Sequence, residues 1–72
     1  MSIHLTLKDL RIAARWSKQE LARRSELDAK TVTRAESGQT VQEVKAAIIL
    51  DTLNKALGTS YTLSDVEGVA VK

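Results

Sequence analysis

The sequence predicts an all-α fold, a compact bundle of four to five short helices. One observation is that a Ser or Thr is followed three residues later by an acidic residue, a pattern typical of helix N-termini. It occurs at Thr6/Asp9, Ser17/Glu20, Thr40/Glu43 and Thr62/Asp65. Apolar residues between these points recur at helical spacing. The chain also lacks proline, and its three glycines follow the ends of expected helices.

Three short helices are expected in the first half of the chain, at residues 7–14, 18–25 and 29–37. The first two begin after Thr6 and Ser17, whose hydroxyls can accept the backbone N–H three residues further on. The third begins after Asp28, a favourable N-cap residue that has no acidic partner. The inward-facing residues are expected to be Leu7, Leu10, Ala14, Leu21, Ala22, Val32 and Ala35.

A longer helix is expected at residues 41–57 and a short one at residues 63–67. The longer helix begins after Thr40 and ends at Gly58, because glycine readily adopts the left-handed conformation that often terminates a helix. The short helix follows Thr62, and the tail at residues 68–72 is a candidate for extended chain. The inward-facing residues of the longer helix are expected to be Val44, Ala47, Ile48, Leu50, Leu53 and Leu57.

Length and composition exclude several classes of protein. With 72 residues, the chain is expected to form one domain (1–72), with its core at residues 5–58 and a candidate dimerisation segment at residues 59–72. The absence of cysteine excludes disulfides, and the single histidine, His4, has no clustered ligands for a metal. No apolar run reaches the roughly 20 residues that span a bilayer. We therefore expect no metal, no cofactor and no membrane association.

An enzyme is not expected. The serines have no base nearby that could complete a hydrolase triad, and the chain has no glycine-rich phosphate loop. The charge is distributed unevenly, because residues 1–34 carry a net charge of +4 and residues 35–72 a net charge of −2. A basic half suggests a surface for a polyanion, whereas the alternative is a solvated helical surface of mixed charge.

The segments at 18–25 and 29–37 are joined by only a few residues. Such a tight connection forces two helices to cross steeply, so that the second can project from the domain. In this second helix Val32 and Ala35 are expected to face the core, while Lys30 and Arg34 face outward with Ala29 and Thr33. A projecting helix fits the major groove of B-DNA, where Lys and Arg suit guanine and an alanine methyl suits thymine.

The stretch from Ser17 to Gln39 resembles the phage-repressor and Cro helix-turn-helix family, also called the xenobiotic-response-element family. The residues that match this family in register are Leu10, Arg11, Ser17, Leu21, Ala22, Leu27, Thr31, Val32, Thr33, Arg34, Glu36, Gly38, Leu53, Lys55, Ala56, Leu57 and Gly58. The resemblance covers about residues 5–66 and implies a lambda-repressor-like arrangement of the helices.

The resemblance implies a role for each matching position. It assigns contacts with DNA bases to Ala29, Lys30, Thr33 and Arg34. It assigns contacts with DNA phosphates to Ser17, Lys18, Ser37, Gln39 and Thr40. It also implies a structural ion pair between Arg11 and Glu36.

Four features depart from the family pattern. Lys18 replaces a glutamine, and Ser25 replaces an apolar residue, which thins the core. Glu26 replaces the glycine of the turn, and a positive φ there would cost energy, so a reshaped turn or a longer preceding helix is expected. The stretch from Gly38 to Gly58 is about one helical turn longer than usual, which favours an early start of the longer helix.

These features together favour a sequence-specific, double-stranded DNA-binding regulator of transcription, a repressor that binds a near-palindromic operator as a homodimer. A cytoplasmic location, associated with the nucleoid, is expected. The candidates for the dimer surface are Ile49, Leu63, Val66, Val69 and Val71, unless these residues pack internally. The alternative function is a protein-interaction module of the same fold, an antitoxin or antirepressor that binds a partner protein.

Overall fold

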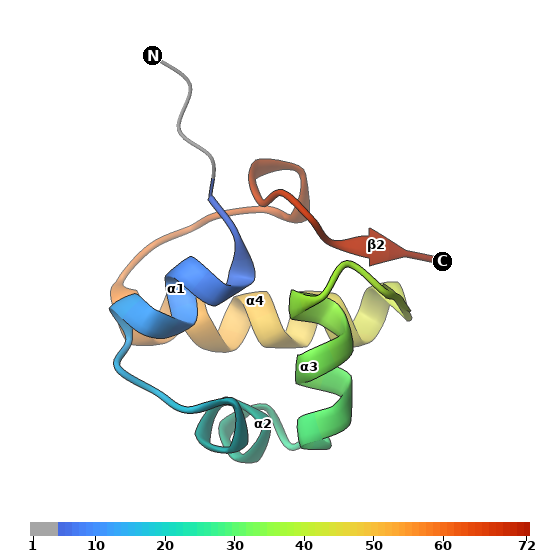
Figure 1. Cartoon of the computed structure of the whole chain (residues 1–72). Helices are drawn as coiled ribbons and strands as arrows, with labels where there is room; N and C mark the ends of the chain where they lie inside the picture. Colours follow the sequence, from blue (N-terminus) through green and yellow to red (C-terminus); the bar gives the residue numbers. More distant parts are fainter. Residues whose placement is uncertain (1–4) are drawn as a thin grey trace.

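The computed structural model describes residues 5–72, so His4 lies outside the described part of the chain. Four α-helices, a single 3-10 turn and two short strands follow one another along these residues (Figure 1). In chain order they are α1 (Leu7–Ala13), α2 (Lys18–Ser25), α3 (Ala29–Glu36), β1 (Thr40–Val41), α4 (Glu43–Leu57), η1 (Leu63–Asp65) and β2 (Ala70–Val71). The predicted all-α fold class is confirmed, with the two-stranded pairing as an addition to it.

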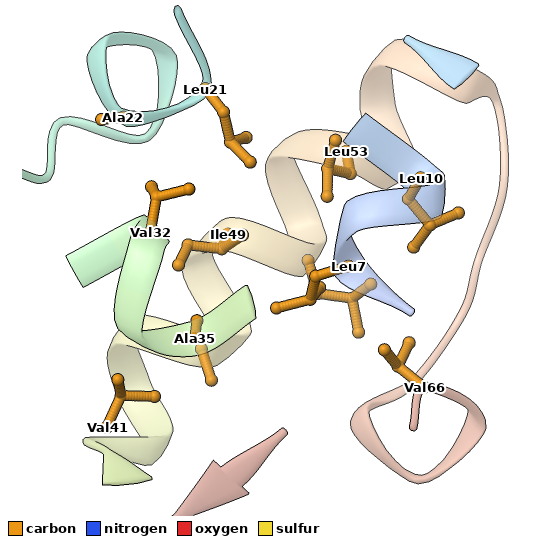
Figure 2. Packing of buried hydrophobic residues seen from close by; sticks show 12 residues of the cluster. Leu7, Leu10, Leu21, Ala22, Val32, Ala35, Val41, Ile49, Leu53 and Val66 are labelled. Atoms are coloured by element: carbon orange, nitrogen blue, oxygen red, sulfur yellow. The ribbon is translucent and has the colours of Figure 1, made fainter. Parts of the chain in front are cut away.

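The core lies where α1, α2 and α3 pack against α4 (Figures 1 and 2). Its buried apolar residues are Leu7, Leu10, Leu21, Ala22, Val32, Ala35, Val41, Ala46, Ile49, Leu50, Leu53 and Val66. Figure 2 shows Ile49 and Leu53 of α4 turned toward side chains from the first three helices. The inward faces predicted for α1, α2 and α3 agree with this core, except that Ala14 is only half-buried.

Local capping explains where α1 and α2 begin. The Thr6 hydroxyl accepts the backbone N–H of Asp9, whose carboxylate accepts the N–H of Thr6 in return. Ser17 caps α2 in the same way, but the return bond is missing because the Glu20 carboxylate binds two arginines instead. Asp28 occupies the N-cap position of α3 without a side-chain hydrogen bond.

The prediction that Thr40 caps the longer helix is wrong. Gln42 is the N-cap residue of α4, while Thr40 and Val41 form β1. The strand pairs in parallel with β2, with Thr40 opposite Ala70 and Val41 opposite Val71. The side chain of Val41 is buried there, so pairing and burial outweigh the local cap.

The C-terminal segment also differs from the prediction. The helix expected at 63–67 is only the 3-10 turn η1, because Val66 leaves the helical conformation and is buried against the core. The backbone N–H of Glu67 then donates to the carbonyl of Leu5 at 2.7 Å, and β2 follows beside β1. In Figure 1 this red segment lies beside the connection between α3 and α4.

The inward face of α4 was predicted only in part. Leu50 and Leu53 are buried as expected. Val44, Ala47 and Ile48, by contrast, are exposed, and Ala46 and Ile49 are buried in their place. Residues 44–50 are apolar almost all round the helix, so periodicity cannot select the inward face, and packing decides it. Two candidates for a dimer surface, Ile49 and Val66, therefore belong to the core. Of the other three, Leu63 and Val69 pack partly against the core, while Val71 is exposed.

Candidate nucleic-acid interface

The corner between α2 and α3 positions the candidate interface. Glu26 ends α2 in the left-handed conformation, with φ of 58°, and its backbone N–H donates to the carbonyl of Arg23. The next N–H, from Leu27, donates to the carbonyl of Ala22 at 2.9 Å. The turn therefore keeps the conformation that glycine would adopt most easily, and α2 ends at Ser25 as it would with glycine there. The expected reshaping of the turn or lengthening of the helix does not occur.

One side of α3 faces away from the protein. Val32 and Ala35 are buried on the inner side, whereas Lys30, Thr33 and Arg34 are exposed. These three residues line a single shallow hollow with Ala29, which is half-buried, and with Gln39 from the loop after α3. The structure thus brings the four sequence-predicted base-contacting residues together on one surface, and adds a predicted phosphate-contacting residue to it.

An ion pair holds the inner side of α3 to α1. Nε of Arg11 lies 2.7 Å from Oε2 of Glu36, and Nη2 lies 3.2 Å from Oε1 of the same carboxylate. Nη1 of Arg11 donates to the backbone carbonyl of Trp16 at 3.0 Å. The side chains of Arg11 and Glu36 are only 12% and 4% exposed. This bidentate geometry fixes the end of α3 relative to α1 and the start of α2.

The predicted phosphate contacts lie in two groups. Ser17 and Lys18 are exposed at the start of α2, whereas Ser37, Gln39 and Thr40 are exposed after the end of α3. The Ser17 hydroxyl accepts the N–H of Glu20, which leaves its own hydrogen available for an anion. The Ser37 hydroxyl instead donates to the carbonyl of Thr33 within its own helix. The hydroxyl hydrogen of Ser37 is therefore less available to an anion than that of Ser17.

Positive charge is unevenly compensated over this surface. No carboxylate of residues 5–72 forms an ion pair with Lys18, Lys30 or Arg34. Arg23 and Arg24, by contrast, both lie 2.6 Å from Oε2 of Glu20. Hydrogen bonds from Arg23 and then Arg24 lower the pKa of the Glu20 carboxyl, so this carboxylate stays ionised.

Arg24 also makes a cation–π contact, because its guanidinium lies 4.5 Å from the centre of the Trp16 ring. The cations on α3 and at the start of α2 therefore have no acidic partner among residues 5–72, and the same is true of Lys8, Arg15, Lys45 and Lys72. A second hollow brings Lys45 and Lys72 together with Arg34. Sequence reasoning gave Lys72 no role at this surface, because no local signal marks a residue 38 positions from Arg34 along the chain.

Residues 5–72 contain no group of three or more His, Cys, Asp or Glu side chains that could hold a metal ion. No helix of residues 5–72 has both the length and the apolar character needed to cross a membrane.

In comparison with known proteins, a family model described as a helix-turn-helix domain matches residues 5–66, which include α1 to α4 and η1. No curated protein and no solved structure matches the chain.

Proposed function

The chain belongs to the helix-turn-helix domain family, and on this premise we propose that it is a sequence-specific, double-stranded DNA-binding regulator of transcription. One observation carries the proposal: Lys30 and Arg34 project from α3 without acidic partners in residues 5–72. Ala29 and Thr33 lie on the same surface. An exposed helix with two unpaired cations suits the major groove, whose floor is electronegative at guanine.

In the proposed complex α3 lies in the major groove. Lys30 and Arg34 donate to guanine O6 and N7, the Ala29 methyl packs against a thymine methyl, and Thr33 reaches a neighbouring base edge. Phosphates on one side of the groove bind Ser17 and Lys18, assisted by the positive end of α2. Phosphates on the other side bind Gln39 and Thr40, with Ser37 contributing less. Repression follows when the occupied operator excludes polymerase.

Selection from a random duplex pool, followed by fluorescence anisotropy on the selected site, tests this proposal. We expect Lys30→Gln and Arg34→Gln each to weaken binding to that site by about 1–3 kcal/mol, or about 5- to 150-fold. The matched control is Lys8→Gln, which removes one exposed charge from α1. Equal affinity of the double variant and the Lys8 variant would refute the recognition role of α3.

We propose further that the regulator binds a near-palindromic operator as a homodimer, with half-sites about one DNA turn apart. The support is an exposed apolar stripe on α4, in which Val44 is 69% and Ile48 is 38% exposed with exposed Ala47 between them. This stripe replaces the buried Ile49 and Val66 as the candidate dimer surface. Packing of two such stripes would remove from water apolar area that the folded monomer leaves exposed.

Sedimentation velocity tests the dimer. We expect the unmodified chain to sediment as a dimer and Val44→Ser/Ile48→Ser as a monomer, while Ile12→Ser, an exposed apolar residue on α1, leaves the dimer intact. A monomeric unmodified chain, both free and on DNA, would contradict the dimer. The antitoxin or antirepressor alternative requires that the stripe bind a different protein, and it predicts no salt-dependent affinity for duplex DNA.

A further inference from the structure

A second hollow lies directly beside the surface of α3. It is lined by Thr31, Arg34, Thr40, Val41, Gln42, Lys45 and Lys72. Arg34 also lines the hollow that contains Lys30 and Thr33, so one side chain separates the two. The two hollows are therefore neighbouring parts of one surface.

The second hollow is rich in hydrogen-bond donors and poor in negative charge. Arg34, Lys45 and Lys72 come from three different segments, and none of them pairs with a carboxylate of residues 5–72. The hydroxyls of Thr31 and Thr40 and the amide of Gln42 can also donate. Three cations held together without an acidic partner repel one another, and a bound anion would relieve that repulsion.

The C-terminal segment is what brings Lys72 to this place. Its strand β2 pairs in parallel with β1, and the backbone N–H of Lys72 donates to the carbonyl of Val41 at 3.2 Å. A second parallel bridge joins Glu67 to Thr6, and Val66 just before this bridge is buried. The segment is thus attached on both sides of Gly68, and Figure 1 shows it ending beside the α3–α4 connection.

We propose that this hollow binds a backbone phosphate of the DNA duplex, with Lys45 and Lys72 as phosphate ligands beyond those of the helix-turn-helix unit. The inference rests on the proposed function, because it takes the groove to be filled by α3. When the outer side of α3 faces the bases, the strands that border the groove come to lie along its flanks. Thr31 is on one flank, and the hollow opens there, next to Arg34.

A phosphate contact has a specific thermodynamic signature. The affinity for duplex DNA falls with salt concentration, and the slope of log K against log salt is about −0.9 per phosphate contact. Losing this one phosphate contact should make the slope shallower by about 0.9 and weaken binding to every duplex sequence alike. Neutralising a base-reading residue should instead change the preference between sequences.

The experiment is a salt series on a random-sequence duplex, measured by anisotropy for the full chain, Lys45→Gln, Lys72→Gln and the double variant. The matched control is Lys55→Gln on the same helix α4, whose ammonium group pairs with Asp51 at 3.1 Å, away from the hollow. We expect a slope shallower by about 0.9 for the double variant, a smaller change in the same direction for each single variant and no change for Lys55→Gln. Lys45→Arg keeps the charge and should keep the slope.

The outcomes separate this proposal from the one on which it rests. Salt-dependent binding by the full chain, with the double variant matching Lys55→Gln, would overturn the phosphate site and leave recognition by α3 standing. No salt-dependent binding by the full chain would overturn both proposals. Saturable binding of inorganic phosphate, with duplex affinity unaffected in the variants, would also overturn the assignment to DNA. Thermal unfolding of each variant verifies that differences in slope arise in folded protein.

Discussion

The ion pair between Arg11 and Glu36 gives the sharpest test of how the candidate interface is held in place. Glu36 ends α3, and its carboxylate accepts two N–H groups of Arg11 at 2.7 and 3.2 Å. Both side chains are largely shielded from water. Removing one partner leaves the other charge buried without compensation, which costs about 3–5 kcal/mol in such pairs. We expect Glu36→Gln to cost about 3 kcal/mol, the lower end of this range, because the glutamine amide oxygen can still accept one N–H.

This loss is large for so small a domain. At about 0.05–0.15 kcal/mol per residue, 72 residues have a total stability of about 4–11 kcal/mol. A chain of this size unfolds in urea with a slope of about 1 kcal/mol per molar. Glu36→Gln should therefore lower the urea midpoint by about 3 M, which far-UV circular dichroism measures directly.

Two comparisons make the result specific. Arg23→Gln removes one partner of the ion pair with Glu20, in which Arg23 is 71% exposed, and should change stability by less than about 1 kcal/mol. Arg11→Met/Glu36→Leu removes both buried charges together and should lose much less than the sum of the single variants. A midpoint for Glu36→Gln no lower than that of Arg23→Gln would refute the reasoning, because the pair would then behave as an exposed one.

Two further predictions concern the end of α2. Glu26→Gly should stabilise the domain by about 0.5–1 kcal/mol in the same urea assay. The reason is that the left-handed conformation costs a residue other than glycine about 1–2 kcal/mol, which exceeds the entropic cost of glycine. A lower urea midpoint would mean that the Glu26 side chain stabilises the turn. Ser25→Ala should raise the free energy of unfolding by about 1 kcal/mol, since the Ser25 hydroxyl is buried with no hydrogen-bond partner in residues 5–72. A lower free energy of unfolding would show that this hydroxyl is satisfied by water.

The fold and the α3 surface could be predicted from the sequence to the extent that they depend on neighbouring residues. The Thr6 and Ser17 caps were predicted because each hydroxyl meets a backbone N–H three residues away. The outward set on α3 was predicted because two buried residues, Val32 and Ala35, fix the phase of a short helix. Thr40 has the same local pattern, yet its backbone pairs with Ala70, 30 residues away.

The sequence by itself therefore determined where most of the helices begin and end and which side of α3 is exposed. It also determined that Glu26 and Ser25 stand where the family pattern has a glycine and an apolar residue. Only the tertiary structure decided which of residues 44–49 α4 buries, the attachment of the tail to β1, and the grouping of Lys45 and Lys72 with Arg34. The physical reason is how far apart along the chain the interacting residues lie. Caps and helical periodicity act between residues three or four apart, whereas packing and strand pairing join segments whose distance along the chain carries no local signal.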